Sequence, residues 1–258
     1  MGSMARWTAA LAIYPDEVTL QVIRTHLLIS QGRLIEGWGE IEKLSRNGLH
    51  SQKNKAFQAH VLNARYLTAT GMLPAALSLL QLLDRDAADA ATHCYVRNLL
   101  AINLVKVGDL DRAKIVLGSA AREGRRAGER QRLALVLQNQ AMVLQRLREP
   151  VAALKALDKA IRLLQVDGGS IFLINAYLLK AWMLAGLQGK ERAVAHVLWM
   201  DGTLAEEYAR LPLPLRWKVD HIHRTFNLAT PFYFPYRQFV PREFSWQLIE
   251  SDLVLDPA

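Results

Sequence analysis

The sequence contains a single cysteine and no long uninterrupted apolar run. With Cys94 alone the chain cannot form an internal disulfide, so a reducing compartment is the simpler expectation. The most apolar stretch, residues 171–187, is interrupted by Asn175 and Lys180 and is short for a membrane span. Residues 1–3, before Met4, have the composition of an expression scar, and no signal-peptide pattern follows them. We therefore expect a cytoplasmic protein with no membrane partner.

The sequence also lacks the motifs of an enzyme. It has no G-x-x-x-x-G-K-[ST] phosphate loop, and no serine or cysteine has a base at a recognisable catalytic spacing. The best metal candidate is DHIH, residues 220–223. On the helix expected there His221 and His223 stand about 200° apart and cannot share an ion. We predict a non-enzymatic chain with no catalytic residues, no cofactor and no metal.

Positive charge is in excess, because 32 Lys and Arg residues outnumber 24 Asp and Glu residues and give a formal charge of +8. A nucleic acid is therefore a partner to test. The most basic stretch is AREGRRAGERQR, residues 121–132, which holds five arginines but also two glutamates and no aromatic residue. We interpret it as a solvated joint between a helix that ends near Arg122 and a helix that begins near Arg130, with turns at Gly124 and Gly128.

One pattern recurs five times along the chain. A leucine follows a small residue by three positions, a second small residue comes nine positions after the leucine, and an apolar residue comes four positions later. The five sets are Thr25, Leu28, Gly37 and Ile41; Ala64, Leu67, Ala76 and Leu80; Ala101, Leu104, Ala113 and Leu117; Ala141, Leu144, Ala153 and Leu157; and Ala181, Leu184, Ala193 and Val197. Spacings of three and four are helical, and glycines or Pro150 separate the two halves of each set. Each set predicts an antiparallel helix pair whose small residues let the two backbones approach closely.

The glycine and alanine spacing resembles that of tetratricopeptide (TPR) repeats. The carriers are Gly71–x4–Ala76 and Gly108–x4–Ala113, with Ala64 and Ala101 seven residues before each glycine. The period of about 39 residues is longer than the usual 34 or so, no unit has the early tryptophan, and Arg148 and Gln188 stand where the turn glycine belongs. The resemblance implies an all-α, TPR-like right-handed solenoid of about five antiparallel helix pairs, followed by a C-terminal helix and an extended aromatic tail.

Residues 116–165 have a narrower resemblance, to the C-terminal helical-repeat region of MalT-like, ATP-dependent LuxR-type bacterial activators. The match lies in a helix that ends in a Gly-Arg-rich turn, a Leu/Gln/Ala helix, and an "AALKALDKAI" helix. This resemblance implies the sensor domain of a transcriptional regulator, which binds an inducer or a partner protein. DNA would then be bound only through a helix-turn-helix module that we do not recognise in this sequence.

The domain organisation follows from the repeat. Residues 4–212 are predicted to form one TPR-like domain, and residues 213–258 its C-terminal capping helix and tail. Seven of the chain's aromatic residues lie in the tail, at 231–246. We interpret this tail as a segment that covers the apolar end of the repeat or occupies its groove. The N-terminal "WTAALAIYP" is typical of the end of a repeat, which suggests either a piece of a longer protein or a lone capping helix.

The candidate binding residues lie on the first helix of each pair, at positions three, six, ten and thirteen before the turn and beside them. These positions face the concave side of a helical repeat, which suits a peptide, a protein segment or a small inducer. The candidates are His26, Arg65, Tyr95, Asn98, Lys106, Gln138, Gln145, Arg146 and Trp182. A solvated inner face without a ligand, a free-standing adaptor and a nucleic-acid-binding repeat remain as alternatives.

Overall fold

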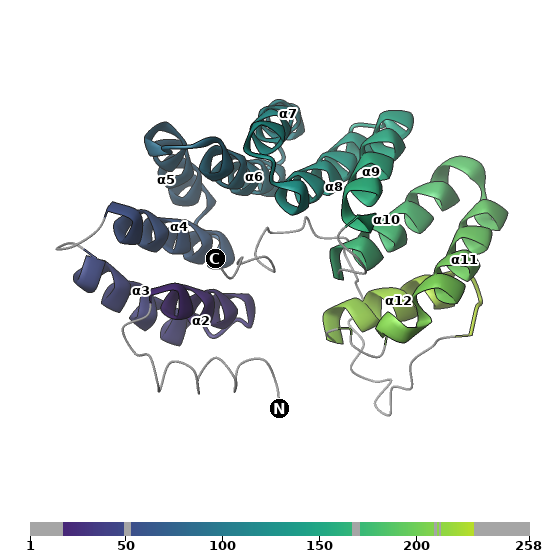
Figure 1. Cartoon of the computed structure of the whole chain (residues 1–258), viewed down its shortest axis with the longest axis horizontal. Helices are drawn as coiled ribbons and strands as arrows, with labels where there is room; N and C mark the ends of the chain where they lie inside the picture. Colours follow the sequence, from purple (N-terminus) through teal and green to yellow (C-terminus); the bar gives the residue numbers. More distant parts are fainter. Residues whose placement is uncertain (1–17, 49–52, 167–170, 209–210, 212, 230–258) are drawn as a thin grey trace. The chain divides into compact units, whose positions relative to one another are not determined.

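The computed structural model describes residues 18–48, 53–166, 171–208, 211 and 213–229. Every regular element in these ranges is an α-helix (Figure 1). The helices are α2 (Val18–Ser30), α3 (Leu34–Gly48), α4 (Lys53–Ala69), α5 (Leu73–Asp86), α6 (Ala90–Lys106), α7 (Leu110–Ala127), α8 (Arg130–Arg146), α9 (Pro150–Gln165), α10 (Ile171–Gln188), α11 (Lys190–Tyr208) and α12 (Leu213–Thr225). The aromatic tail and the "WTAALAIYP" segment lie outside the described residues.

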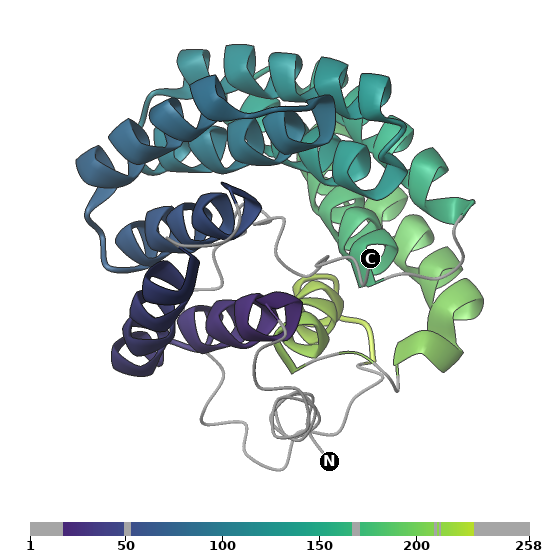
Figure 2. The ribbon, with the colours of Figure 1, turned by 60° about the vertical axis from the view of Figure 1, so that its left-hand side comes forward.

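The helices form the five predicted pairs. The chain divides into two compact units, with the boundary between Gly128 and Glu129. The N-terminal unit holds the pairs α2/α3, α4/α5 and α6/α7, and the C-terminal unit holds α8/α9, α10/α11 and the single helix α12. Within each unit the first helices of successive pairs also pack together, α2 on α4 and α4 on α6, and α8 on α10 and α10 on α12 (Figures 1 and 2). The predicted all-α helical-repeat fold is confirmed.

The small residues of the repeat lie where the two helices of each pair meet. Ala101 and Ala113 of the third pair and Ala141 and Ala153 of the fourth are all fully buried, at 0% exposure. At Gly37 in the first pair a Cβ atom would come within 3.0 Å of the Ile29 side chain, so only glycine fits without a shift. The small residues thus allow a close packing of the paired helices that larger side chains would prevent.

Left-handed residues end the first helix of each pair, and two of them show how the sequence departs from the TPR pattern. Arg148 takes the left-handed conformation itself, with φ +60°, in a region where residues other than glycine are uncommon. Gln188 is instead the last residue of α10, and Gly189, with φ +89°, makes the turn one position later. The chain therefore keeps the turn geometry at both sites by different means.

The joint in the stretch 121–132 is shorter than the sequence predicts. The expectation that a helix ends near Arg122 is wrong, because α7 continues to Ala127, with Gly124 buried inside the helix rather than in a turn. Gly128, with φ +71°, caps α7 in the left-handed conformation, and α8 begins at Arg130. Arg125 and Arg126 occupy the last turn of α7, where positive charge stabilises the helix end.

Candidate binding surface

The N-terminal unit carries polar side chains on its stacked first helices. His26 on α2, Arg65 on α4 and Asn98 on α6 are buried, at 3%, 5% and 0% exposure. Burial, and then the positive charge of Arg65, lower the pKa of His26 to about 2, so this imidazole is neutral at physiological pH. A cationic group and two uncharged hydrogen-bonding groups thus lie on three successive first helices.

A second group of polar side chains on the first helices of the N-terminal unit joins α4 to α6. The Thr68 hydroxyl donates to Asn103 Oδ1 at 2.9 Å, and Asn103 Nδ2 donates to the Leu99 carbonyl at 2.9 Å. Beside Thr68, Asn103 and Arg65 lies a cavity of about 10 Å³, which is the room that one water molecule needs. Thr68 stands three positions before Gly71, at one of the inner positions that the repeat predicts, whereas Asn103 was not predicted as a site residue.

In the C-terminal unit, polar side chains from α8, α10 and α12 contact one another in a row, which we call the polar ladder. Gln138 on α8 is fully buried, and its Oε1 accepts from Asn175 Nδ2 on α10 at 3.0 Å. Lys218 Nζ on α12 donates to Asn175 Oδ1 at 2.7 Å. Gln138 Nε2 also donates to the Phe172 carbonyl at 3.3 Å. The last step of the ladder therefore joins two residues that are 43 positions apart in sequence.

Lys218 makes this ladder electrostatically unusual. Burial lowers the pKa of its ammonium group from 10.5 to about 8. Below about pH 8 the lysine is charged in the folded chain, and this charge lowers the free energy of unfolding. The loss of stability becomes smaller between about pH 8 and 10.5, where the folded chain releases the proton before the unfolded chain does. Leucine at this position would pack α12 on α10 without that cost, so packing alone does not explain Lys218.

The other predicted site residues lie at different depths. Tyr95 and Gln145 are half-buried, Lys106 and Arg146 are exposed in the last turns of α6 and α8, and Trp182 on α10 is 38% exposed. Gln138 is the predicted residue that the structure brings into the ladder; Asn175 and Lys218 were missed as site residues. Asn175 had a signal, because it stands thirteen positions before Gln188 and interrupts an apolar helix. Whether these residues bind a ligand stays a prediction.

The DHIH segment forms a structural contact between α11 and α12. His221 is exposed and His223 is fully buried, in agreement with their predicted separation on the helix. His223 Nε2 lies 2.8 Å from Asp201 Oδ2, and its Nδ1 lies 2.7 Å from the Val219 carbonyl. Tyr208 donates to the other oxygen of Asp201 at 2.9 Å. Because both ring nitrogens of His223 face acceptors, both can donate only when the ring is protonated.

We expect this contact to make stability depend on pH. Burial lowers the pKa of His223, but hydrogen bonds to Asp201 and to the Val219 carbonyl outweigh it and raise the pKa above 6.5. A raised folded pKa gives stabilisation that is complete below about pH 6.5 and is lost as pH rises through the folded value. In thermal unfolding followed by circular dichroism, His223→Gln should cost most below pH 6.5 and progressively less toward pH 8. The exposed control His221→Gln should change little, and a cost of His223→Gln that grows with pH would contradict the assignment.

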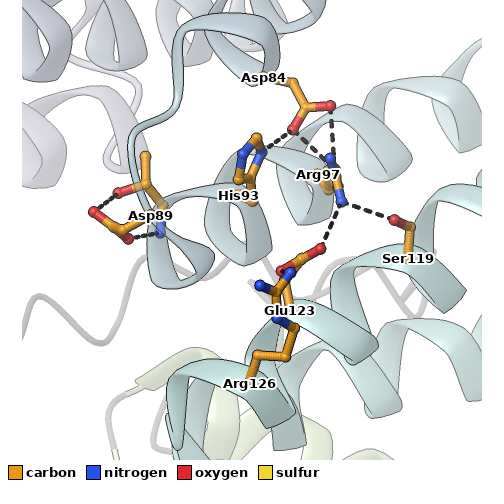
Figure 3. A network of polar contacts seen from close by, with 8 residues as sticks. Asp84, Asp89, His93, Arg97, Ser119, Glu123 and Arg126 are labelled. Carbon is orange, nitrogen blue, oxygen red and sulfur yellow. Dashed lines mark hydrogen bonds and ion pairs between the residues drawn. The ribbon is translucent and has the colours of Figure 1, made fainter.

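A third polar network ties together α5, α6 and α7 (Figure 3). Arg97 Nε donates to both oxygens of Asp84, at 2.8 and 3.1 Å, and Arg97 Nη1 donates to Ser119 at 2.8 Å and to Glu123 at 3.4 Å. His93 Nδ1 lies 2.9 Å from Asp84, and Arg126 donates to Glu123 at 3.1 Å. Every charged group in the network has a partner of opposite charge, which indicates a structural role rather than a catalytic one.

The possible metal ligands in the described ranges are scattered. No three His, Cys, Asp or Glu side chains there are grouped to hold a metal ion. Cys94 is fully buried. No helix in the part of the chain that the structure describes is both long and apolar enough to cross a membrane.

Comparisons with known proteins show the fold. No protein-family model matches the sequence, and no curated protein matches it. The apo form of RapI aligns with 81% of this chain and 77% of its own at 12% identity, with a TM-score of 0.65. BtubC (BKLC) from P. vanneervenii aligns with 96% of this chain and 94% of its own at 16% identity, with a TM-score of 0.58. A putative kinesin light chain from Podosopora anserina with nearly identical TPR-like repeats aligns with 74% of this chain and 98% of its own at 12% identity, with a TM-score of 0.57. The chain has the TPR-like helical-repeat fold that its sequence predicts.

Proposed function

We propose that this chain is a non-enzymatic interaction module that binds a protein segment or peptide on the first helices of its repeats. The observation that carries the proposal is the ladder of Gln138, Asn175 and Lys218 on α8, α10 and α12. Gln138 holds Asn175, and Asn175 accepts from Lys218, so the two amides fix the position of an ammonium group that can attract a carboxylate of the bound segment. A lysine kept in a half-buried position at a cost to stability is typical of a binding position.

The finer proposal is that the module is the sensor domain of a bacterial transcriptional regulator. Residues 116–165, whose likeness to MalT-like activators supports this role, span the end of α7, the whole of α8 and α9 up to Gln165. A small inducer is then a second kind of ligand for the same surface. A free-standing adaptor fits the TPR-like fold equally well.

The ladder can be tested with peptides selected from a phage-displayed library on the wild-type chain. Lys218→Met should weaken the selected peptides at least about tenfold, because it removes the charge that attracts a carboxylate. The same substitution should keep or raise the melting temperature, since it also removes the cost of burying the charge. Fluorescence anisotropy measures the first effect and circular dichroism the second.

The matched control is Lys159→Met, because Lys159 is exposed on α9. It removes the same charge from the same unit and should leave peptide affinity unchanged. Unchanged affinity in Lys218→Met, and also in Arg65→Met, Asn98→Leu and Arg146→Met, would overturn the assignment of the binding surface to the first helices. Affinity that falls steeply with salt for an oligonucleotide, together with weak peptide binding, would favour the nucleic-acid alternative.

A further inference from the structure

A groove lies on the C-terminal unit, away from the polar ladder. Helices α9, α10 and α11 line this open groove, whose volume of about 450 Å³ is within the range of ligand sites. The residues that line it include Asp158, Lys180, Leu184, Arg192, His196 and Trp199. Leu184 follows Asn175 by nine positions, or two and a half helical turns, and therefore stands on the opposite side of α10. The groove and the ladder are separate surfaces.

An aromatic cluster forms one wall of the groove. Trp199 is 48% exposed and stacks on His196, with ring centroids 5.8 Å apart and planes at 23°. Tyr177 contacts the Trp199 ring edge-on at 5.1 Å. His196 Nε2 lies 3.1 Å from the Tyr177 carbonyl, and burial followed by the charge of Lys180 lowers the pKa of His196 to about 4. The wall is thus held in place by a hydrogen bond and is uncharged, so it offers a surface for an apolar side chain.

The charges of the groove leave one cation available. Lys180 forms an ion pair with Asp158 at 2.8 Å, so these two charges compensate each other. Arg192 is exposed on the first turns of α11 and has no hydrogen-bond or ion-pair partner among the described residues. A guanidinium group can bind a carboxylate through two parallel hydrogen bonds.

Arg192 and Trp199 have a defined spacing. They are seven residues apart on α11, which corresponds to about 10.5 Å along the helix axis. An extended segment in the polyproline II conformation has three residues per turn and rises about 3.1 Å per residue, so side chains three positions apart lie on one face, about 9 Å from each other. A carboxylate and an apolar side chain three positions apart on such a segment therefore match the spacing between Arg192 and Trp199.

We propose that this groove binds an extended acidic segment of a partner protein, with a carboxylate on Arg192 and an apolar or aromatic side chain on Trp199. The chain's charge of +8 complements such a partner. A nucleic acid fits less well, because it carries a charge on every nucleotide, whereas the groove offers one uncompensated cation and contains the carboxylate of Asp158.

The probe for this site is a fluorescein-labelled hexapeptide, Gly-Glu-Ser-Gly-Phe-Gly, titrated with the full chain in a fluorescence anisotropy experiment. We expect saturable binding that Arg192→Gln and Trp199→Ala each weaken at least about tenfold. Arg162→Gln is the matched control, because Arg162 is an exposed arginine on α9 that does not line the groove. It should leave the affinity unchanged, and a peptide with lysine in place of glutamate should bind at least tenfold more weakly.

Three outcomes would overturn the proposal. These are no saturable binding up to about 1 mM peptide, equal losses for Arg192→Gln and Arg162→Gln, and tighter binding of a hexathymidine oligonucleotide than of the peptide. Circular dichroism melting curves show whether each variant is folded. Lys218→Met should leave binding of this hexapeptide intact, so failure at the groove and failure of the ladder on the first helices give different results.

Discussion

Replacing Arg97 by methionine is expected to lower the free energy of unfolding of the N-terminal unit by about 2–3 kcal/mol at pH 7. The Arg97 side chain is 20% exposed and contacts Asp84 and Glu123, whose side chains are 24% and 15% exposed. Methionine preserves much of the packing but leaves two partly buried carboxylates without their shared cation.

Segment-resolved hydrogen–deuterium exchange of the full chain measures this effect, because it reports α5, α6 and α7 separately from the C-terminal unit. Arg126→Met is the control, since Arg126 contacts the same Glu123 with a side chain that is 75% exposed. An exposed ion pair contributes little, so the control should cost less than about 1 kcal/mol. Equal losses in the two variants would contradict a role for Arg97 as the shared partner of the two carboxylates.

Replacing Leu157 by alanine is expected to lower the free energy of unfolding of the C-terminal unit by about 2–5 kcal/mol. Leu157 is fully buried on α9, at the repeat position that Leu117 and Leu80 occupy in the preceding pairs. The truncation leaves a cavity between helices whose positions are constrained by Ala141 and Ala153, so the surroundings cannot collapse fully.

Equilibrium unfolding in urea, followed by far-ultraviolet circular dichroism, measures this loss. Val151→Ala removes a side chain from the same helix at a position that is 58% exposed and should change stability by less than about 0.5 kcal/mol. A small effect of Leu157→Ala would mean that the helices of the fourth pair do not depend on this contact, contrary to the repeat pattern.

The contrast between Leu157 and Lys218 shows how far the sequence alone leads. The recurrence of Leu157 and its equivalents every 37–40 residues predicts a buried position, and the structure confirms it. Lys218 belongs to no repeat, and in sequence it is one more charged residue in a basic chain. Its position beside Asn175 depends on how α12 packs on α10, which helical periodicity does not specify.

Helical periodicity, small residues and turn signals therefore determined the five helix pairs, the buried repeat positions and the turns within each pair, because these depend on neighbours within one or two turns of the same chain. The sequence did not predict that α7 continues past Arg122 with Gly124 buried inside the helix. Only the tertiary structure decided that Gln138, Asn175 and Lys218 form one ladder, that Arg97 joins Asp84 to Glu123, and that His196 and Trp199 line a groove with Arg192. Each of these arrangements joins side chains of separate helices or lines a groove between helices. Their geometry follows from the distance and angle at which helices pack, which are set by the fit of many side chains at once.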